Sequence, residues 1–208
     1  MEAQNQPTGV EKLVRPSQPD CILAVNDVTY LSMYYKQESS DLWTGGIGLH
    51  RRSPSTEHEP SKEVQFSYFE GVGLFDGKIT SKEVDSFTLL AATVQKSLRL
   101  YKVDSSGSAA PKLLHETSLD SNPVYVHTLS TETQPSPLSV VSGENGYLWR
   151  VQTTAEGLKV IDTIKHSKFT SWAAWTHSED RPVYCGGDEG LFYLFDVKSG
   201  KKITQVKQ

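Results

Sequence analysis

The stretch VVSGENGYLWRV (residues 140–151) has the pattern of a β-strand, a tight turn and a second strand. The same pattern is read in LWTGGIGLHR (residues 42–51), AATVQKSLRLYKV (residues 91–103) and VYCGGDEGLFYLFDV (residues 183–197). Aligning the small residue that closes each turn gives Gly48, Ser97, Gly146 and Gly190, at intervals of 49, 49 and 44 residues. A repeat of this length is typical of the four-stranded blades of a β-propeller, which bury their apolar faces only by stacking. The sequence therefore predicts an all-β propeller.

Short β-rich segments separated by turn-forming clusters complete the repeats. The third repeat contains four of them, at residues 124–130, 138–143, 147–152 and 158–164, and the fourth repeats this order. We expect four blades, at about residues 20–70, 71–120, 121–164 and 165–208.

Two segments lack this pattern. Residues 1–19 contain three prolines and few apolar residues, which is typical of a flexible leader. Residues 51–62 have the same character and are expected to form a surface loop in the first repeat.

Four blades make only a partial propeller. A propeller closes its ring by pairing the first and last blades, and most families of this kind need more than four units. We therefore expect that this chain alone does not close the ring: either it is part of a longer product, or a partner covers the exposed blade face.

Composition narrows the classes of function. The 208 residues carry a formal charge of −4, and the pI is about 5.9, so no basic surface for nucleic acid is expected. No apolar run approaches the length of a membrane helix, and the polar start lacks the apolar centre of a secretion signal. The two cysteines, Cys21 and Cys185, are too few for a disulfide framework. These features favour a cytoplasmic protein without a membrane or nucleic-acid partner.

The fourth repeat contains the polar residues that are the best candidates for a catalytic role. His166 precedes its first strand and Asp188 lies in its tight turn. A histidine with an aspartate can act as a catalytic base and its orienter. The alternative is that the pair fixes the blade by a buried hydrogen bond, and no Gly-x-Ser-x-Gly element supports catalysis.

Metal and cofactor motifs are missing from the sequence. Its six histidines show neither His-x-x-x-His spacing nor a Cys-x-x-Cys partner, and no glycine-rich phosphate loop occurs. We therefore predict no metal and no cofactor. Trp172 and Trp175 are three residues apart, so in a regular strand they would point to opposite faces, with at least one of them exposed near the rim.

The fourth repeat resembles a WD-repeat blade. In such blades a histidine, a strand serine or threonine, a turn aspartate and a tryptophan form a buried network. Here His166 and Asp188 are kept, Cys185 stands near the serine position, and Phe195 replaces the tryptophan. The resemblance implies an incomplete network with at most a contact between His166 and Asp188.

A narrower resemblance covers KHSKFTSWAAWTHSEDRPVYCGGDEGLFYLFDV (residues 165–197). This block is similar to the signature of the diphthine methylesterase family, which are WD-repeat proteins of diphthamide biosynthesis. The matching positions are His166, Phe169, Trp172, Trp175, Val183, Tyr184, Gly186, Gly187, Asp188, Gly190 and Asp196. The chain departs from that signature at Thr170-Ser171, Cys185, Glu189 and Phe195 and corresponds only to the N-terminal half of such proteins.

The resemblance implies a carboxylic ester hydrolase that removes the methyl group of methylated diphthine on elongation factor 2. His166 would then be the base and Asp188 its orienter. The alternative is a non-catalytic WD-repeat scaffold that mediates protein–protein interactions.

Overall fold

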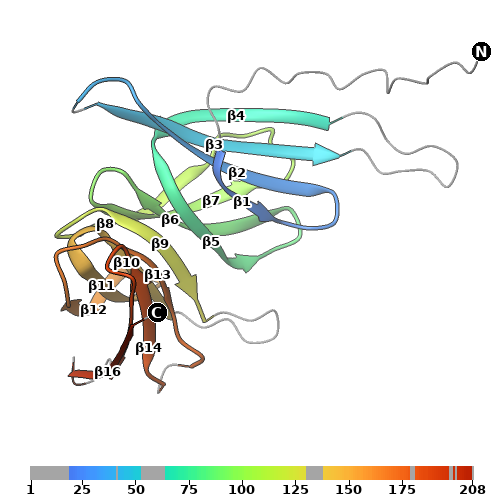
Figure 1. The fold of residues 1–208 in the computed structure, drawn as a ribbon. Coiled ribbons are helices and arrows are strands. Elements are labelled where there is room, and N and C mark those ends of the chain that lie inside the picture. The colour runs from blue at the N-terminus through green and yellow to red at the C-terminus, as the bar shows by residue number, and fades with distance from the viewer. Residues whose placement is uncertain are drawn as a thin grey trace, which may run out of the picture.

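The computed structural model describes residues 19–40, 42–52, 64–129, 138–178, 181–196, 199 and 201–207. These residues form four antiparallel sheets of four strands each, so the predicted all-β fold is confirmed (Figure 1). The expected leader lies outside the described residues apart from Pro19, and most of the expected loop at residues 51–62 also lies outside them.

We number the sheets as blades 1 to 4. Blade 1 consists of β1 (Pro19–Ala24), β2 (Thr29–Gln37), β3 (Trp43–Arg52) and β4 (Val64–Val72). Blade 2 consists of β5 (Leu74–Lys82), β6 (Ser86–Thr93), β7 (Ser97–Asp104) and β8 (Lys112–Ser118). Blade 3 consists of β9 (Pro123–Thr128), β10 (Leu138–Gly143), β11 (Tyr147–Thr154) and β12 (Gly157–Lys165). Blade 4 consists of β13 (Ser171–Trp175), β14 (Val183–Gly187), β15 (Leu191–Asp196) and β16 (Lys201–Lys207).

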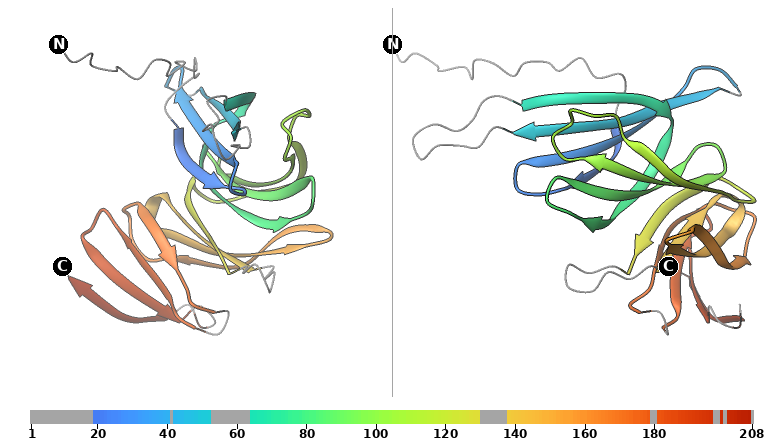
Figure 2. Two further views of the ribbon diagram at one scale, coloured as in Figure 1. Left: turned by 90° about the vertical axis from the view of Figure 1, so that its right-hand side faces the viewer. Right: turned by 180° about the vertical axis from the view of Figure 1, so that it is seen from behind.

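The strands of each blade follow one another in chain order, and the first strands of neighbouring blades lie side by side. The blades fan out around an arc, with blade 1 at one end and blade 4 at the other (Figure 2, left). The ring is therefore open, as expected for a partial propeller. In the described part of the chain the only helix is the 3₁₀ turn Glu144–Gly146, and none is long and apolar enough to cross a membrane.

Apolar residues at alternate strand positions make the seams between blades. The seam between blades 1 and 2 is built around Leu31, Met33, Leu89 and Ala91, all of which are fully buried. The next seams contain Leu90 against Trp149, and Val140 against Phe195. Since odd and even positions of a strand face opposite sides, a blade in the middle of the stack buries both its faces.

The first repeat corrects one prediction. The expected strand–turn–strand at residues 42–51 is wrong: this stretch is the single strand β3, and Gly48 pairs with Ser32 and Tyr68 in its middle. A side chain at position 48 would collide with side chains of the neighbouring strands. A Cβ at Gly48 would lie 2.6 Å from Ser32 Oγ, so the residue serves close packing rather than a turn.

Asp76 links the inner strands of three blades. This residue of β5 is 7% exposed. Its carboxylate accepts a hydrogen bond from Cys21 Sγ of blade 1 at 3.0 Å and from the backbone N–H of Val126 of blade 3 at 2.8 Å. Burial and the neighbouring Asp76 carboxylate raise the pKa of Cys21 to about 12, so the thiol keeps its proton and remains a donor.

We expect Asp76→Ala to lower the free energy of unfolding by about 2 kcal/mol, because it leaves the buried N–H of Val126 without an acceptor. Urea denaturation followed by circular dichroism measures the change. The exposed Asp85 provides the control, and Asp85→Ala should change the free energy by less than about 0.5 kcal/mol. Equal effects of the two substitutions would contradict the role of Asp76.

Candidate interaction site on the fourth blade

His166 lies between β12 and β13, in the connection from blade 3 to blade 4. Its backbone N–H donates to the carbonyl of Gly146 at 3.0 Å, which fixes the loop on blade 3. Its ring packs 4.7 Å from the ring of Tyr193 and 5.2 Å from that of Phe195, measured between centroids. The imidazole is thus held at the seam between the two blades.

Two side chains contact the Nε2 atom of His166. Ser171 Oγ lies 2.7 Å from it and Cys185 Sγ 3.7 Å from it. Both of these residues are only 1% exposed. Burial, followed by the nearby Glu189, raises the pKa of Cys185 to about 12, so its sulfur is a protonated thiol and a poor nucleophile.

The structure does not join His166 to Asp188. Among the described residues the buried Nδ1 of His166 has no hydrogen-bond partner. The carboxylate of Asp188 instead accepts a hydrogen bond from Trp172 Nε1 at 2.5 Å, and its backbone N–H donates to the carbonyl of Thr170 at 3.1 Å. Asp188 therefore orients a tryptophan on the surface rather than the imidazole beneath it.

Sequence reasoning missed the pairing of His166 with Ser171. The serine was noted only as a departure from the family signature. The pairing could have been predicted from the positions of the two residues in the sequence. Ser171 is the first residue of the strand that follows His166, and only a short connection separates them. Ser171, the first residue of β13, faces blade 3, and the loop that leads into β13 places His166 within reach of it.

The exposed residues near this cluster include two aromatic side chains, one acidic side chain and one basic side chain. Trp172 is 55% exposed and Phe169 is 42% exposed. Asp188 is exposed next to Trp172, to which it is hydrogen-bonded, and Lys168 Nζ lies 5.5 Å from the centroid of the Phe169 ring. We call Phe169, Trp172 and Asp188 the fourth-blade rim. Trp175 is 47% exposed as well, so both tryptophans face solvent.

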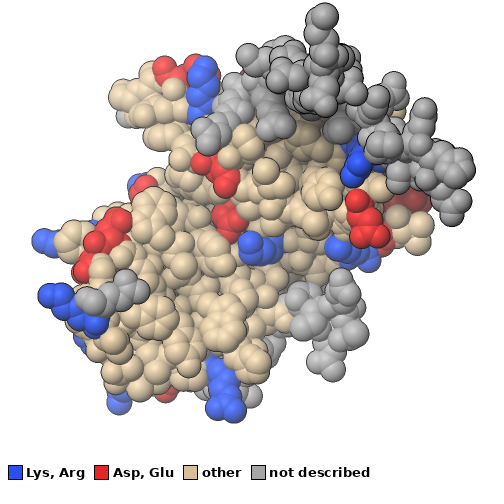
Figure 3. Space-filling view, turned by 45° about the vertical axis from the view of Figure 1, so that its right-hand side comes forward, with Lys and Arg blue, Asp and Glu red and all other residues tan. Residues whose placement is uncertain are grey.

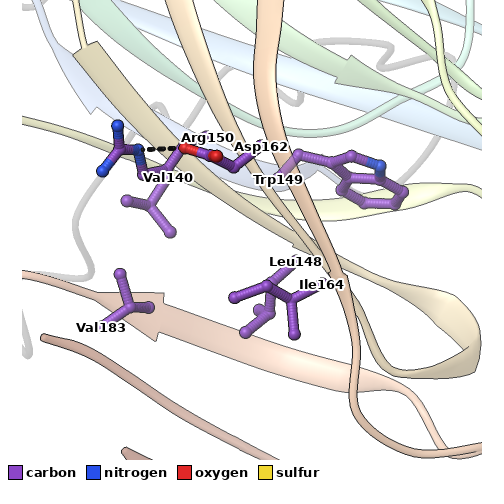
Figure 4. A pocket seen from close by; sticks show the side chains of 7 residues that line it. All are labelled: Val140, Leu148, Trp149, Arg150, Asp162, Ile164 and Val183. Atoms are coloured by element: carbon purple, nitrogen blue, oxygen red, sulfur yellow. Dashed lines mark ion pairs between the residues drawn. The ribbon is translucent and has the colours of Figure 1, made fainter. Parts of the chain in front are cut away.

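The seam below offers little room for a ligand. Its gap is lined by Val140, Leu148, Trp149, Arg150, Asp162, Ile164 and Val183 (Figure 4). About 10 Å³ is free there, no more than one water molecule requires. Arg150 Nε lies 2.9 Å from Asp162 Oδ2, so an ion pair borders this gap.

The described residues form neither a large basic surface on the face seen in Figure 3 nor a cluster of metal ligands. Figure 3 shows basic and acidic residues interspersed on one face, without a continuous basic area. Within the described ranges no three His, Cys, Asp or Glu residues come together as metal ligands.

Comparison with known proteins gives the class of fold. No protein-family model matches the chain, and no curated protein matches it in sequence. Among solved structures, Sqt1 from Chaetomium thermophilum is similar with a TM-score of 0.62 and 14% identity, over 86% of this chain and 46% of that chain. The WD40 domain of coronin from Toxoplasma gondii is similar with a TM-score of 0.60 and 10% identity, over 86% of this chain and 43% of that chain.

These similarities and the four stacked sheets define a WD40-type β-propeller fold. The chain spans less than half the length of the structures it matches. Sqt1 has also been solved bound to the N-terminus of ribosomal protein L10, and that complex is similar to this chain with a TM-score of 0.61 and 14% identity.

Protonation of His166 should destabilise the fold. Burial lowers the pKa of its imidazole from the ordinary 6.5, while Glu189 raises it and Lys202 lowers it. Between this lowered pKa and 6.5 the unfolded chain binds more protons than the folded chain, so stability falls as the pH falls through that window.

We expect the free energy of unfolding to decrease between about pH 7.5 and pH 5.5, and His166→Phe to reduce this decrease. Urea titrations at both pH values measure it. Because burial also lowers the pKa of His127, part of the pH dependence should remain. An unchanged dependence in His166→Phe would show that the imidazole keeps its ordinary pKa.

Proposed function

We propose that this chain is a WD-repeat scaffold that binds another protein through the fourth-blade rim. The observation that carries the proposal is Trp172. Its side chain is 55% exposed, although the hydrogen bond to Asp188 holds it in place. A tryptophan that is fixed in solvent loses little entropy on binding and offers a large apolar area, which is why tryptophans dominate many interfaces.

The rest of the rim supports this function. Phe169, three positions before Trp172, is a second exposed aromatic residue, and the carboxylate of Asp188 adds a negative charge next to Trp172. The similar structure of Sqt1 bound to the N-terminus of ribosomal protein L10 is one case in which a protein with this fold binds a protein segment. For this chain the resemblance of residues 165–197 suggests elongation factor 2 as the partner, in the cytoplasm.

The test is a binding titration with purified elongation factor 2. Trp172→Ala should weaken binding by about thirtyfold, the effect of losing a central tryptophan. Val84→Ala is the matched control, because Val84 is 95% exposed in the turn between β5 and β6, away from the rim. Equal affinity of the two variants would exclude the rim, and no binding by the unchanged chain would exclude this partner.

A second candidate function is hydrolysis of the diphthine methyl ester on elongation factor 2. The hydrogen bond between Ser171 Oγ and His166 Nε2 favours it, because a hydroxyl next to a base is the arrangement of an activated nucleophile. The serine oxygen would attack the ester carbonyl and pass its proton to His166, which would return it to the departing methanol. Water would then release the acid from the serine. Since Ser171 is 1% exposed, the rim would have to open first.

Methanol release from elongation factor 2 that carries methylated diphthine tests this second function. Ser171→Ala and His166→Ala should each abolish release, because they remove the nucleophile and its base. Ser118→Ala, at an exposed position of β8, should leave it unchanged. Release that persists in Ser171→Ala would contradict the serine as nucleophile. If the folded, unchanged chain released no methanol, hydrolysis would be excluded and the scaffold would be the remaining proposal.

A further inference from the structure

The seam between blades 1 and 2 contains a pocket where β3 and β4 of blade 1 face β7 of blade 2. About 120 Å³ is free there, whereas about 10 Å³ is free in the seam between blades 3 and 4. A cavity of about 150 Å³ can take up a molecule the size of benzene. The pocket therefore has room for one apolar side chain of another molecule. We call it the seam pocket.

The walls of the seam pocket are mostly apolar. Ile47 of β3 lies opposite Phe69 of β4, and because Ile47 packs into the core shared with blade 2, both side chains face that blade. Val72 and Leu74, at the junction of the two blades, also line the pocket, and Leu74 is only 1% exposed. Ligand pockets in proteins have this composition, with apolar walls and a few polar groups that orient the ligand.

Two side chains of β7 supply the polar groups. Leu98 and Leu100 pack towards blade 3, so Arg99 and Tyr101, at the alternate positions, face blade 1 and line the pocket. Arg99 Nε donates to Glu116 Oε1 at 2.9 Å, and Arg99 Nη1 donates to the hydroxyl oxygen of Tyr101 at 3.5 Å. Within the described part of the chain, Arg99 Nη2 and the hydroxyl proton of Tyr101 have no acceptor. The pocket thus contains donors that a ligand can use.

A chain of hydrogen bonds holds the guanidinium of Arg99 in place. Glu116 Oε1 also accepts from Ser97 Oγ at 2.7 Å, and Ser97 Oγ lies 2.9 Å from Thr93 Oγ1. Ser97 is 3% exposed and Thr93 is fully buried. Because these residues fix the carboxylate, Arg99 presents its remaining N–H groups to the pocket in one orientation. A ligand that accepts from them immobilises little additional side chain when it binds.

The charges at the seam pocket balance. The carboxylate of Glu116 pairs with the guanidinium of Arg99. Glu70 also borders the pocket, but it follows Phe69 in β4, so its side chain points to the opposite face of the strand. On that face, burial and then the Glu70 carboxylate raise the pKa of Tyr68. The unused donors therefore match a neutral acceptor, such as an amide carbonyl, better than a carboxylate.

We propose that the seam pocket binds a segment of a partner protein through one aliphatic side chain the size of leucine. The backbone carbonyl next to that side chain accepts hydrogen bonds from Arg99 Nη2 and from the hydroxyl of Tyr101. An apolar side chain that fills a desolvated pocket typically contributes strongly to an interface. The site lies on blades 1 and 2, so it is a second interaction surface and is independent of the fourth-blade rim.

Nuclear magnetic resonance titration of the 23.1 kDa chain with N-acetyl-leucine methylamide tests the pocket. This compound has one leucine side chain with a neutral amide carbonyl on each side of it. The amide signals of Gly46, Gly71 and Leu74, which line the pocket, should shift and saturate with a dissociation constant of about 1 mM, as expected for a ligand of this size. The absence of saturable shifts at these positions would overturn the proposal.

Two related compounds test what the pocket recognises. N-acetyl-alanine methylamide should bind at least about tenfold more weakly, because its methyl group leaves the apolar walls unfilled. N-acetyl-leucine, which ends in a carboxylate, should also bind more weakly, because Glu116 already balances the guanidinium. Equal affinity for the alanine compound would contradict the aliphatic anchor. Equal or tighter binding of N-acetyl-leucine would show a site for acids and would overturn the proposed peptide segment.

A side chain at position 71 should close the pocket. Gly71 lies two positions after Phe69 and shares its face, and a Cβ there would meet no atom of the described chain within 4 Å beyond its own neighbours. Gly71→Leu should therefore fold and weaken binding of N-acetyl-leucine methylamide at least about tenfold. Gln65→Leu is the matched control, because Gln65 is exposed on the same strand and does not line the pocket. Equal binding by the two folded variants would contradict the site.

Tyr101→Phe tests the polar part of the pocket. This substitution keeps the ring as a wall and removes only the hydroxyl, so binding of N-acetyl-leucine methylamide should weaken by about fivefold. Trp172→Ala, at the fourth-blade rim, should leave this binding unchanged, which separates the two proposed surfaces. Unchanged affinity of Tyr101→Phe would contradict the proposed hydrogen bond to the ligand carbonyl, and the amide spectrum confirms that each variant is folded.

Discussion

The structure depends on one requirement: a four-stranded sheet with two apolar faces must cover both of them. The seams meet it between neighbouring blades, where Leu31 and Leu89, or Leu90 and Trp149, leave water together. Each blade is therefore stable only beside another blade, and the chain behaves as a stack in which neighbours support one another. On the side of blade 4 that faces away from blade 3, which no described strand covers, Trp175 and Phe192 remain 47% and 43% exposed.

Polar groups inside the stack follow the same logic, because burial without a partner is costly. Asp76 receives donors from two other blades and so connects three sheets near the inner edge. At the seam between blades 3 and 4, Ser171 Oγ and Cys185 Sγ both contact His166 Nε2, while the buried Nδ1 of that ring has no partner among the described residues. His166 is a catalytic candidate in the sequence, yet the burial of its neighbours Ser171 and Cys185 makes a structural role the simplest one. The accessible chemistry lies above them, on the rim that carries Trp172.

The blades with clear turn signals could be predicted from the sequence. Between β10 and β11, Asn145 and Gly146 have φ of 56° and 67°, a conformation that these two residue types adopt readily. Gly190 plays the same part between β14 and β15, with φ of 64°. The first repeat was misaligned because Gly48, which lies in the middle of β3, was taken as a turn glycine like Gly146 and Gly190. Because Gly48 has no side chain, Ser32 of the neighbouring strand β2 can pack against it. No local sequence pattern distinguishes such a packing glycine from a turn glycine.

The sequence by itself determined the repeating four-stranded unit, its approximate length and the incomplete ring, because alternation and turn residues act over a few neighbouring positions. It also identified His166, Asp188 and the tryptophans as the residues of interest. Only the tertiary structure decided their partners: Asp188 holds Trp172, and His166 meets Ser171 and Cys185. Those contacts depend on how loops of adjacent strands and blades meet and on a register shift at Ser171, which are set by packing across the whole stack rather than by any one segment.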